Sequence, residues 1–246
     1  RTVRGRGGAV RLEDIERQVD DDTRAVSISH VQWLTGARHR LKPLAELVHS
    51  HGAYLVVDGI QAAGAIKVDV RRDDVDFYAC GSYKWLLGPS GAGFLYVKRE
   101  HLDSLSPVEY GYRAIAEHGE EPRLKETAQK MEFGEPSYLS FVGTKAAVDL
   151  ILRLSPSRIE RQVLKLSQRL FDGLTGLGVE MVSPAEKELR SGVVSFTTPD
   201  TENHFRRLMD SGFLVSLRPA GIRVSTGFYN TVDEVDRLLE KLGEIL

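Results

Sequence analysis

The sequence is short of the features that mark several classes of protein. It has one cysteine, Cys80, in 246 residues, so it cannot form an intrachain disulfide, as is typical of proteins in a reducing cytoplasm. Its 33 Lys and Arg nearly balance its 35 Asp and Glu, and a net charge of −2 gives no attraction to nucleic acid. No apolar run approaches the roughly 20 residues that cross a bilayer. We therefore expect a cytoplasmic globular protein without nucleic-acid or membrane partners.

Strand and helix patterns alternate through the first half of the sequence. Apolar runs typical of buried strands lie at residues 25–30, 54–57, 75–80 and 93–97. Residues 11–19 and 41–51 place apolar side chains at helical intervals. Short connections between alternating strands and helices favour an open, mostly parallel sheet with helices on its faces. We predict a three-layer α/β large domain over residues 1–140, although spacing does not reveal the order of its strands.

The sequence changes character beyond Pro107. Residues 109–136 are polar and contain several glycines and prolines, which predicts a long excursion rather than a core element. Helices are then expected at residues 141–154, 158–177, 202–211 and 231–245, and strands at 193–198, 213–217 and 222–226. Pro219 and Gly221 separate the last two strands and indicate a hairpin turn. We predict a smaller α+β domain over residues 141–246.

Two ionisable residues follow predicted strands of the first half. Asp58 ends one apolar strand, and Lys84 lies beside Trp85 and Leu86 shortly after the next one. Ligands of open α/β sheets bind at the carboxyl ends of the strands. Taken alone, Asp58 could cap a loop and Lys84 could extend along the surface. Together, an acid that keeps a pyridine nitrogen protonated and an amine that forms a Schiff base are what pyridoxal phosphate needs from its protein.

The other patterns give no competing site. His49 and His51 are two residues apart on a predicted helix, so they face different sides and we predict no metal site. The glycine-rich residues 88–93 lack the Gly-Lys-Ser/Thr ending of a phosphate-binding loop. A non-catalytic nucleotide-binding α/β module, with Asp58 on a ribose, needs a Gly-x-Gly-x-x-Gly turn before Asp58, and residues 1–57 contain none. This module is the alternative from another class.

Residues 25–99 resemble the class V aminotransferase family of fold type I. The resemblance rests on V-D-G-x-Q, which begins at Val57, and on K-W-L-x-G-P-x-G, which begins at Lys84, and it resumes at residues 221–242. The family includes cysteine desulfurases, kynureninases and aminotransferases of small amino acids. It implies a homodimeric pyridoxal 5'-phosphate enzyme that acts on an amino acid through a Schiff base on Lys84. Transamination and kynureninase-, epimerase- or lyase-type reactions all remain open.

The resemblance implies a cofactor role for each matching residue. Lys84 would be the Schiff-base lysine, and Asp58 would pair with the ring nitrogen. Gln61 would donate a hydrogen bond to the phenolic oxygen of the ring. Tyr83, and less directly Ser82, would contact the phosphate.

The implied substrate contact is Arg223, which lies in the last predicted strand. It would pair bidentately with the α-carboxylate of the amino acid, a task that suits a planar guanidinium. On its position alone, Arg223 would instead form a surface salt bridge.

Three departures from the family pattern bear on the reaction. A cysteine desulfurase needs a nucleophilic cysteine on a mobile loop, whereas Cys80 lies within a predicted strand, so this alternative is disfavoured. Desulfurases usually carry His directly before the lysine, where this sequence has Tyr83, as in the kynureninase-type branch. Residues 131–136 stand where many relatives have a Gly-Thr that contacts the phosphate across the dimer, and Glu135 would repel that phosphate.

We also expect the chain to be part of a longer protein with an incomplete large domain. In the family, a sizeable segment precedes the matched part and supplies the first strands, a phosphate-binding helix N-terminus and a residue that stacks on the ring. Residues 1–24 are too few to provide these. Each lost charge-assisted hydrogen bond is worth about 1.5–3 kcal/mol, so this chain alone is expected to bind the cofactor weakly and to turn over slowly.

Overall fold

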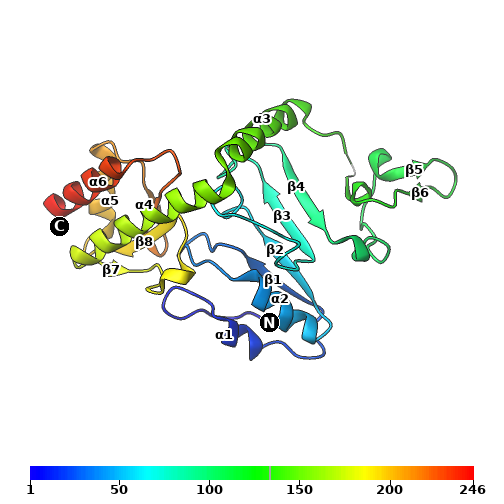
Figure 1. Ribbon diagram of the computed structural model, residues 1–246, viewed down its shortest axis with the longest axis horizontal. Coiled ribbons are helices and arrows are strands. Elements are labelled where there is room, and N and C mark those ends of the chain that lie inside the picture. The colour runs from blue at the N-terminus through cyan, green and yellow to red at the C-terminus, as the bar shows by residue number, and fades with distance from the viewer. Residues whose placement is uncertain (133) are drawn as a thin grey trace.

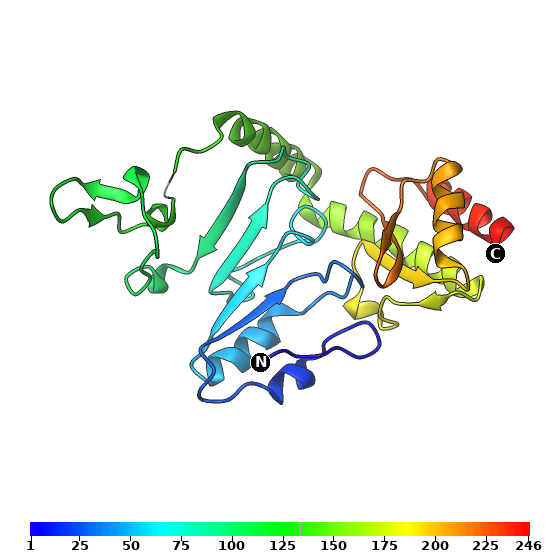
Figure 2. The same cartoon turned by 180° about the vertical axis from the view of Figure 1, so that it is seen from behind.

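The computed structural model describes residues 1–132 and 134–246, which form two separate sheets and a small projecting ribbon (Figure 1). Phe133, which belongs to the segment 131–136 considered above, lies outside the described residues. The first sheet occupies the middle of the molecule, and the second lies at the end that holds the C-terminus. Helices α3 (Tyr138–Leu154) and α4 (Pro156–Gly176) carry the chain from the first sheet to the second (Figure 2).

The first sheet confirms the predicted mostly parallel α/β architecture. Its strands are ordered β1 (Ala25–Ser29), β2 (Tyr54–Asp58), β3 (Phe77–Gly81) and β4 (Gly93–Val97). The first three run parallel, whereas β4 pairs antiparallel with β3. The reversal arises because residues 82–92 turn the chain back beside β3 without the helical crossover that a parallel strand requires.

One face of this sheet is covered by α2 (Leu41–Ser50), and α1 (Leu12–Glu16) lies beside it. Side chains alternate along β2, so Leu55 and Val57 are buried in the core under the helices. Tyr54 and Asp58 have the opposite orientation and are exposed. The carboxylate of Asp58 therefore lies at the end of a strand whose other face anchors it in the core.

The second sheet is antiparallel and is packed against helices. Its strands are ordered β7 (Glu180–Met181), β8 (Val193–Thr197), β10 (Gly221–Ser225) and β9 (Ser216–Arg218). Side chains of α4, α5 (Thr201–Asp210) and α6 (Val232–Ile245) share a buried core with β8 and β10. The predicted hairpin is confirmed, with Pro219 and Ala220 between its strands. The division near residue 140 falls inside α3 and stays a prediction.

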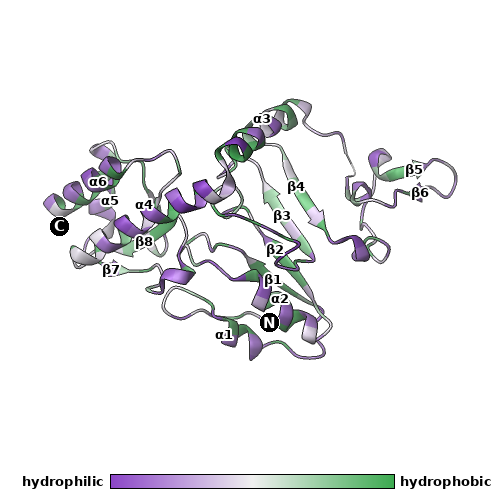
Figure 3. Ribbon diagram, in the orientation of Figure 1, coloured by the Kyte–Doolittle hydropathy of each residue, from purple (hydrophilic) through white to green (hydrophobic). Residues whose placement is uncertain are grey.

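The polar excursion contains only short elements. These are β5 (Ile115–Glu117), β6 (Arg123–Leu124) and the 3₁₀ turns Tyr112–Ala114 and Ala128–Met131. Two further 3₁₀ turns lie outside the excursion, Arg99–His101 shortly after β4 and Lys187–Leu189 before β8. The β5–β6 ribbon projects away from both sheets (Figure 1). Colouring by hydropathy shows apolar stretches on α3 and on β3 and β4 (Figure 3). Among the helices of the described residues, none combines the length and the apolar character needed to span a membrane.

Asp76 is a buried carboxylate directly before β3. Its oxygens lie 2.7 Å from the amide nitrogen of Leu55, 2.8 Å from Nε2 of His49 and 2.6 Å from Nε2 of His101. Burial by itself would raise the pKa of Asp76, but these hydrogen bonds together lower that pKa below the ordinary value of 3.8. Asp76 thus joins α2, β2 and the turn after β4 into one unit.

Replacing Asp76 by asparagine is expected to lower the free energy of unfolding by about 3 kcal/mol near neutral pH, because an NH₂ group replaces one charged acceptor. Since the folded-state pKa is the lower one, the carboxylate stabilises the fold above 3.8 and this contribution is lost as the pH falls through the folded-state value. Urea unfolding should therefore give a gap between wild type and variant that narrows at acidic pH. Asp149→Asn, at an exposed pair with Lys145, is the control with little effect, and a pH-independent gap would contradict the account.

Candidate active site

The structure brings the ends of β2 and β3 together, as their parallel pairing requires. Asp58, the last residue of β2, pairs in register with Ala79 of β3, and Lys84 follows three residues after β3 ends at Gly81. The Asp58 Oδ1 accepts a hydrogen bond from the Ile60 amide at 2.9 Å, which fixes the carboxylate at the strand end. Asp58 and Lys84 both influence the pKa of Cys80, so both charges lie close to that thiol.

Ser82 holds the turn that presents Lys84. Its hydroxyl donates to the carbonyl oxygens of Pro89 (2.6 Å) and Ala92 (3.0 Å), and its side chain is fully buried. The Ser82 carbonyl in turn accepts from the Gly88 amide at 2.9 Å. The single hydroxyl proton is already used inside the turn, so Ser82 has a structural role here, and its contact with a phosphate stays a prediction.

Tyr83 and Lys84 are directed outward from this turn. Tyr83 is 52% exposed, and the Lys84 Nζ lies 5.9 Å from the centroid of the Tyr83 ring. In the described part of the chain, the Lys84 ammonium makes no salt bridge. The amine is therefore not neutralised by a direct ion pair, and the exposed Tyr83 side chain is accessible to a ligand.

Gln61 is buried beside Lys84 and is oriented by Trp85. The indole Nε1 of Trp85 donates to the Gln61 Oε1 at 2.9 Å, which leaves the amide NH₂ group of Gln61 as the donor at the pocket. The segment that follows Gln61 packs tightly against the turn that contains Trp85. Gly64 has a φ of +96°, and a Cβ there would lie 2.3 Å from the Trp85 carbonyl oxygen. Glycine is needed at this position because no side chain fits between the two turns.

Arg223 reaches the same pocket from β10 of the second sheet. Its Nη1 donates to the carbonyl oxygen of Trp33 at 2.9 Å. Its Nε is buried, and no atom of the described residues accepts a hydrogen bond from it. Burial, followed by the nearby charge of Arg218, lowers the pKa of Arg223 below its ordinary value. A buried N–H without an acceptor indicates the place of an anionic ligand, because leaving it unpaired is costly.

These side chains enclose one pocket of about 400 Å³ between the two sheets. Its lining consists of Trp33, Gln61, Lys84, Trp85, Leu87, Arg218, Arg223, Ser225, Gly227, Phe228 and Tyr229. Three of the lining side chains are cationic, and none is acidic. The sequence prediction placed Gln61, Lys84 and Arg223 in one site, and the structure brings them together. Asp58 lies at the adjacent strand end rather than in the lining.

The loop after β1 holds the two sheets in position around this pocket. Its hydrogen bonds with the second half of the chain include Arg223 Nη1 to Trp33 O (2.9 Å), Ser195 Oγ to Leu34 O (2.6 Å), Ser183 Oγ to Thr35 O (2.7 Å) and Arg38 N to Leu189 O (2.7 Å). Within this loop, Gly36 has a φ of +72°, and a Cβ there would lie 2.1 Å from the Val193 carbonyl oxygen. The position of Arg223 in the pocket that also contains Lys84 depends on this close approach.

Replacing Gly36 by alanine is expected to destabilise the chain by about 3 kcal/mol and to displace Arg223 from the pocket. Gly178→Ala is the matched control: its φ of +74° is nearly the same, but nothing lies within 4 Å of a Cβ there. Thermal unfolding of both variants separates the clash from the backbone strain. Equal losses of stability in the two variants would show that the contact with Val193 does not matter.

Sequence reasoning missed three contributors to the site. Trp33 orients Arg223 through a backbone carbonyl, and Trp85 orients Gln61 through its indole N–H. Backbone acceptors carry no residue-type signal, so the role of Trp33 could not be found from sequence. The third contributor, Arg218, was detectable, since it is a cationic residue directly before Pro219 of the predicted hairpin turn.

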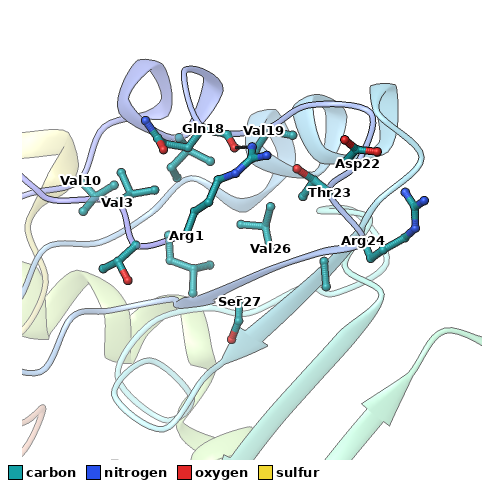
Figure 4. A pocket seen from close by; sticks show the side chains of 14 residues that line it. Arg1, Val3, Val10, Gln18, Val19, Asp22, Thr23, Arg24, Val26 and Ser27 are labelled. Atoms are coloured by element: carbon teal, nitrogen blue, oxygen red, sulfur yellow. Dashed lines mark hydrogen bonds between the residues drawn. The ribbon is translucent and has the colours of Figure 1, made fainter.

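A larger hollow lies beside β1, away from this pocket. It is lined by the N-terminal residues and by the segment that leads into β1, and the Arg1 side chain extends across it toward Gln18 (Figure 4). The Arg1 guanidinium also donates a hydrogen bond to the Asp20 carboxylate. The Arg1 guanidinium is occupied in this way, because it forms a salt bridge with Asp20. The hollow contains none of the residues predicted from the sequence.

Comparison with known proteins assigns these features to a family. The Aminotransferase class-V family model matches residues 4–238. A probable cysteine desulfurase of Halalkalibacterium halodurans is 32% identical over 257 residues, covering 96% of this chain and 62% of that protein. A solved apo cysteine desulfurase from Thermococcus onnurineus NA1 has a TM-score of 0.91 and 29% identity, covering 100% of this chain and 65% of its own.

A further similar structure is that of the cystine C–S lyase C-DES in complex with its product, cysteine persulfide. Its TM-score is 0.86 with 26% identity, and the match covers 94% of this chain and 64% of the lyase chain. Another structure of C-DES has glycine covalently linked to its pyridoxal phosphate cofactor. The present chain thus spans less than two thirds of the length of the relatives that it matches.

Proposed function

The chain belongs to the class V aminotransferase family, and we propose that it forms part of a pyridoxal-phosphate-dependent enzyme that acts on an amino acid. The observation that carries the proposal is the single pocket in which Gln61 and Lys84 of the first half meet Arg223 of the second half. Pyridoxal 5'-phosphate is the cofactor of this family, and the residues around the pocket fit it.

The fit rests on three side chains that each keep a polar group available to a ligand. Lys84 presents an amine without a salt bridge among the described residues, and the Gln61 NH₂ group faces the pocket with its oxygen already satisfied by Trp85. Asp58 offers an exposed carboxylate at the adjacent strand end. When bound, the cofactor supplies an aldehyde for the lysine amine and a protonated pyridine ring that takes up the electron pair released at the substrate α-carbon.

Each residue of the site would then have a separate role. Asp58 would hold the proton on the pyridine nitrogen, and Gln61 would donate to the phenolic oxygen. Arg223 would bind the α-carboxylate through its Nε and Nη2, because Nη1 is already engaged with Trp33. Lys84, which lines the same pocket, would take and return the α-proton as the general base.

Product analysis tests which reaction the enzyme catalyses on its amino acid. The protein that contains this chain would be incubated with a panel of amino acids, with and without a keto-acid acceptor. Acceptor-dependent formation of a new amino acid identifies transamination, whereas products formed without an acceptor identify lyase, hydrolytic or epimerising chemistry. No conversion of any amino acid, with the cofactor demonstrably bound, would contradict the proposal.

Cysteine desulfurase activity is the second candidate, because several relatives carry that name. The environment of Cys80 opposes it on this chain. The thiol is buried within β3 and lies 3.2 Å from the Gly81 carbonyl oxygen, and burial, followed by the charge of Asp58, raises the pKa of Cys80 to about 11. A buried thiol that stays protonated at neutral pH is a poor nucleophile, so we propose no persulfide step on Cys80.

Replacing Cys80 by alanine is accordingly expected to leave the rate of amino-acid turnover within about twofold of wild type. Sulfide release from cysteine, measured for wild type and variant in the presence of a thiol, tests the second candidate directly. A loss of sulfide release on the order of a hundredfold in the variant, with unchanged stability, would establish Cys80 as a nucleophile and overturn our assignment.

We further propose that the enzyme is a homodimer. The support is the run of exposed apolar side chains on α3, where Leu139 is 87% and Val142 is 70% exposed. Contiguous apolar surface of this kind marks a site of association. Sedimentation velocity tests the proposal: a dimer is expected, and a monomer at micromolar concentration would contradict it.

A further inference from the structure

Two arginines occupy the same face of the β9–β10 hairpin. Arg218 pairs in register with Gly221, and Arg223 pairs with Ser216, so side-chain alternation places both guanidinium groups on the side opposite to the buried Ile222. They are diagonal neighbours, a relation that spans roughly 7–8 Å and is within reach of long side chains. Gly221, opposite Arg218, contributes no side chain between them. Both arginines line the pocket that contains Lys84.

Nothing in the described residues neutralises this pair. Neither arginine forms a salt bridge there, and the pocket lining contains no Asp or Glu. The Arg223 Nε is buried without an acceptor, and the charge of Arg218 further disfavours the protonated form of Arg223, as the lowered pKa reflects. Two like charges held beside each other favour a ligand that brings two negative charges.

We propose that the substrate is an amino acid with an acidic side chain, whose α-carboxylate binds Arg223 and whose second anionic group binds Arg218. The inference rests on the proposed function and makes it more specific. Arg223 is the more buried and is oriented by Trp33, which suits the group common to all amino acids. Arg218 is exposed at the end of β9, where side chains of different length are accommodated, and acts as the specificity-determining residue.

The first experiment needs no cofactor. The chain is titrated calorimetrically with succinate, which carries two carboxylates, and with butyrate, which carries one carboxylate on a similar carbon skeleton. We expect succinate to bind about tenfold more tightly, Arg218→Gln to remove that preference, and Arg223→Gln to weaken both ligands. Arg206→Gln, at an exposed pair with Glu202, is the matched control that changes neither. Equal binding of the two acids, or a preference that survives Arg218→Gln, would overturn the inference.

The second experiment separates this inference from the proposed function. Pyridoxal phosphate that is bound to the protein shows induced circular dichroism in its visible absorption band. The protein loaded with cofactor is titrated with L-aspartate and with L-asparagine, which differ in charge but hardly in shape. The quantity compared is the concentration of each amino acid that changes this signal. We expect L-aspartate to act at about tenfold lower concentration in wild type and at the same concentration as L-asparagine in Arg218→Gln. No induced signal at all contradicts the proposed function. A normal signal with equal responses contradicts only the acidic substrate.

The same titration also tests whether Arg218 binds the phosphate of the cofactor instead of the side chain of the substrate. If Arg218 bound that phosphate, Arg218→Gln would weaken the cofactor itself and leave the ratio between L-aspartate and L-asparagine unchanged. That outcome would overturn the inference. Retained cofactor affinity with a lost ratio supports it.

Discussion

Replacing Lys84 by alanine is expected to abolish the induced circular dichroism of the protein incubated with pyridoxal phosphate. The free cofactor is achiral, so the signal reports only molecules held in the pocket, even at an excess that compensates for weak retention. Lys84 lies in the pocket beside Gln61, and its amine makes no salt bridge within the described residues. Without that amine, the covalent link is lost, and proton transfer at the α-carbon is expected to slow by a factor on the order of 10²–10⁴.

Lys165→Ala is the control, since Lys165 is an exposed residue of α4 outside this pocket. It is expected to leave the signal and the rate unchanged. A full signal in Lys84→Ala would assign the cofactor to another lysine and contradict the proposed site. Thermal unfolding of the two variants without cofactor checks that the loss in Lys84→Ala is not a loss of folding.

Replacing Arg223 by glutamine is expected to weaken amino-acid binding about a hundredfold, which corresponds to about 3 kcal/mol. The basis is the loss of a bidentate, charge-assisted contact through Nε and Nη2. The measurement is the concentration of L-alanine or L-aspartate that alters the induced signal of the loaded protein. Cofactor binding itself should change little, because Arg223 is assigned to the substrate.

The stability of this variant distinguishes a binding role from a structural one. Burial disfavours the charged form of Arg223, and its Nε is left without an acceptor in the described structure. Removing the charge should therefore leave the melting temperature unchanged or raise it, because residues that serve function often lower the stability of the fold. A marked fall in melting temperature together with unchanged amino-acid binding would make Arg223 a structural residue that holds Trp33.

Much of the fold could be predicted because its strongest elements have clear local patterns. The apolar run before Asp58 indicated β2, and the helical spacing of apolar residues over 41–51 indicated α2 (Leu41–Ser50). Proline and glycine in the final hairpin indicated its turn. The antiparallel direction of β4 was not predicted, although the connection of residues 82–92 has no helix to carry the chain over to a parallel strand.

The site was predicted in its residue types but not in its arrangement. Lys84 and Asp58 follow adjacent parallel strands, so their proximity follows from topology. The approach of Arg223 from the second sheet depends on the packing of Gly36 against Val193, a tertiary contact with no periodic signal in the sequence. The family resemblance assigned Ser82 to the phosphate, whereas its hydroxyl is engaged inside the turn, and the phosphate contact stays a prediction.

The most direct test of the central claim is to trap the cofactor on the protein. The chain is incubated with excess pyridoxal phosphate, reduced with borohydride, digested and analysed by peptide mass spectrometry, so that even a weakly retained cofactor is recorded at its point of attachment. We predict that the adduct lies on the peptide that contains Lys84 and is absent from the same peptide of Lys84→Ala. An adduct spread over exposed lysines such as Lys165, or found at another single lysine, would contradict the account.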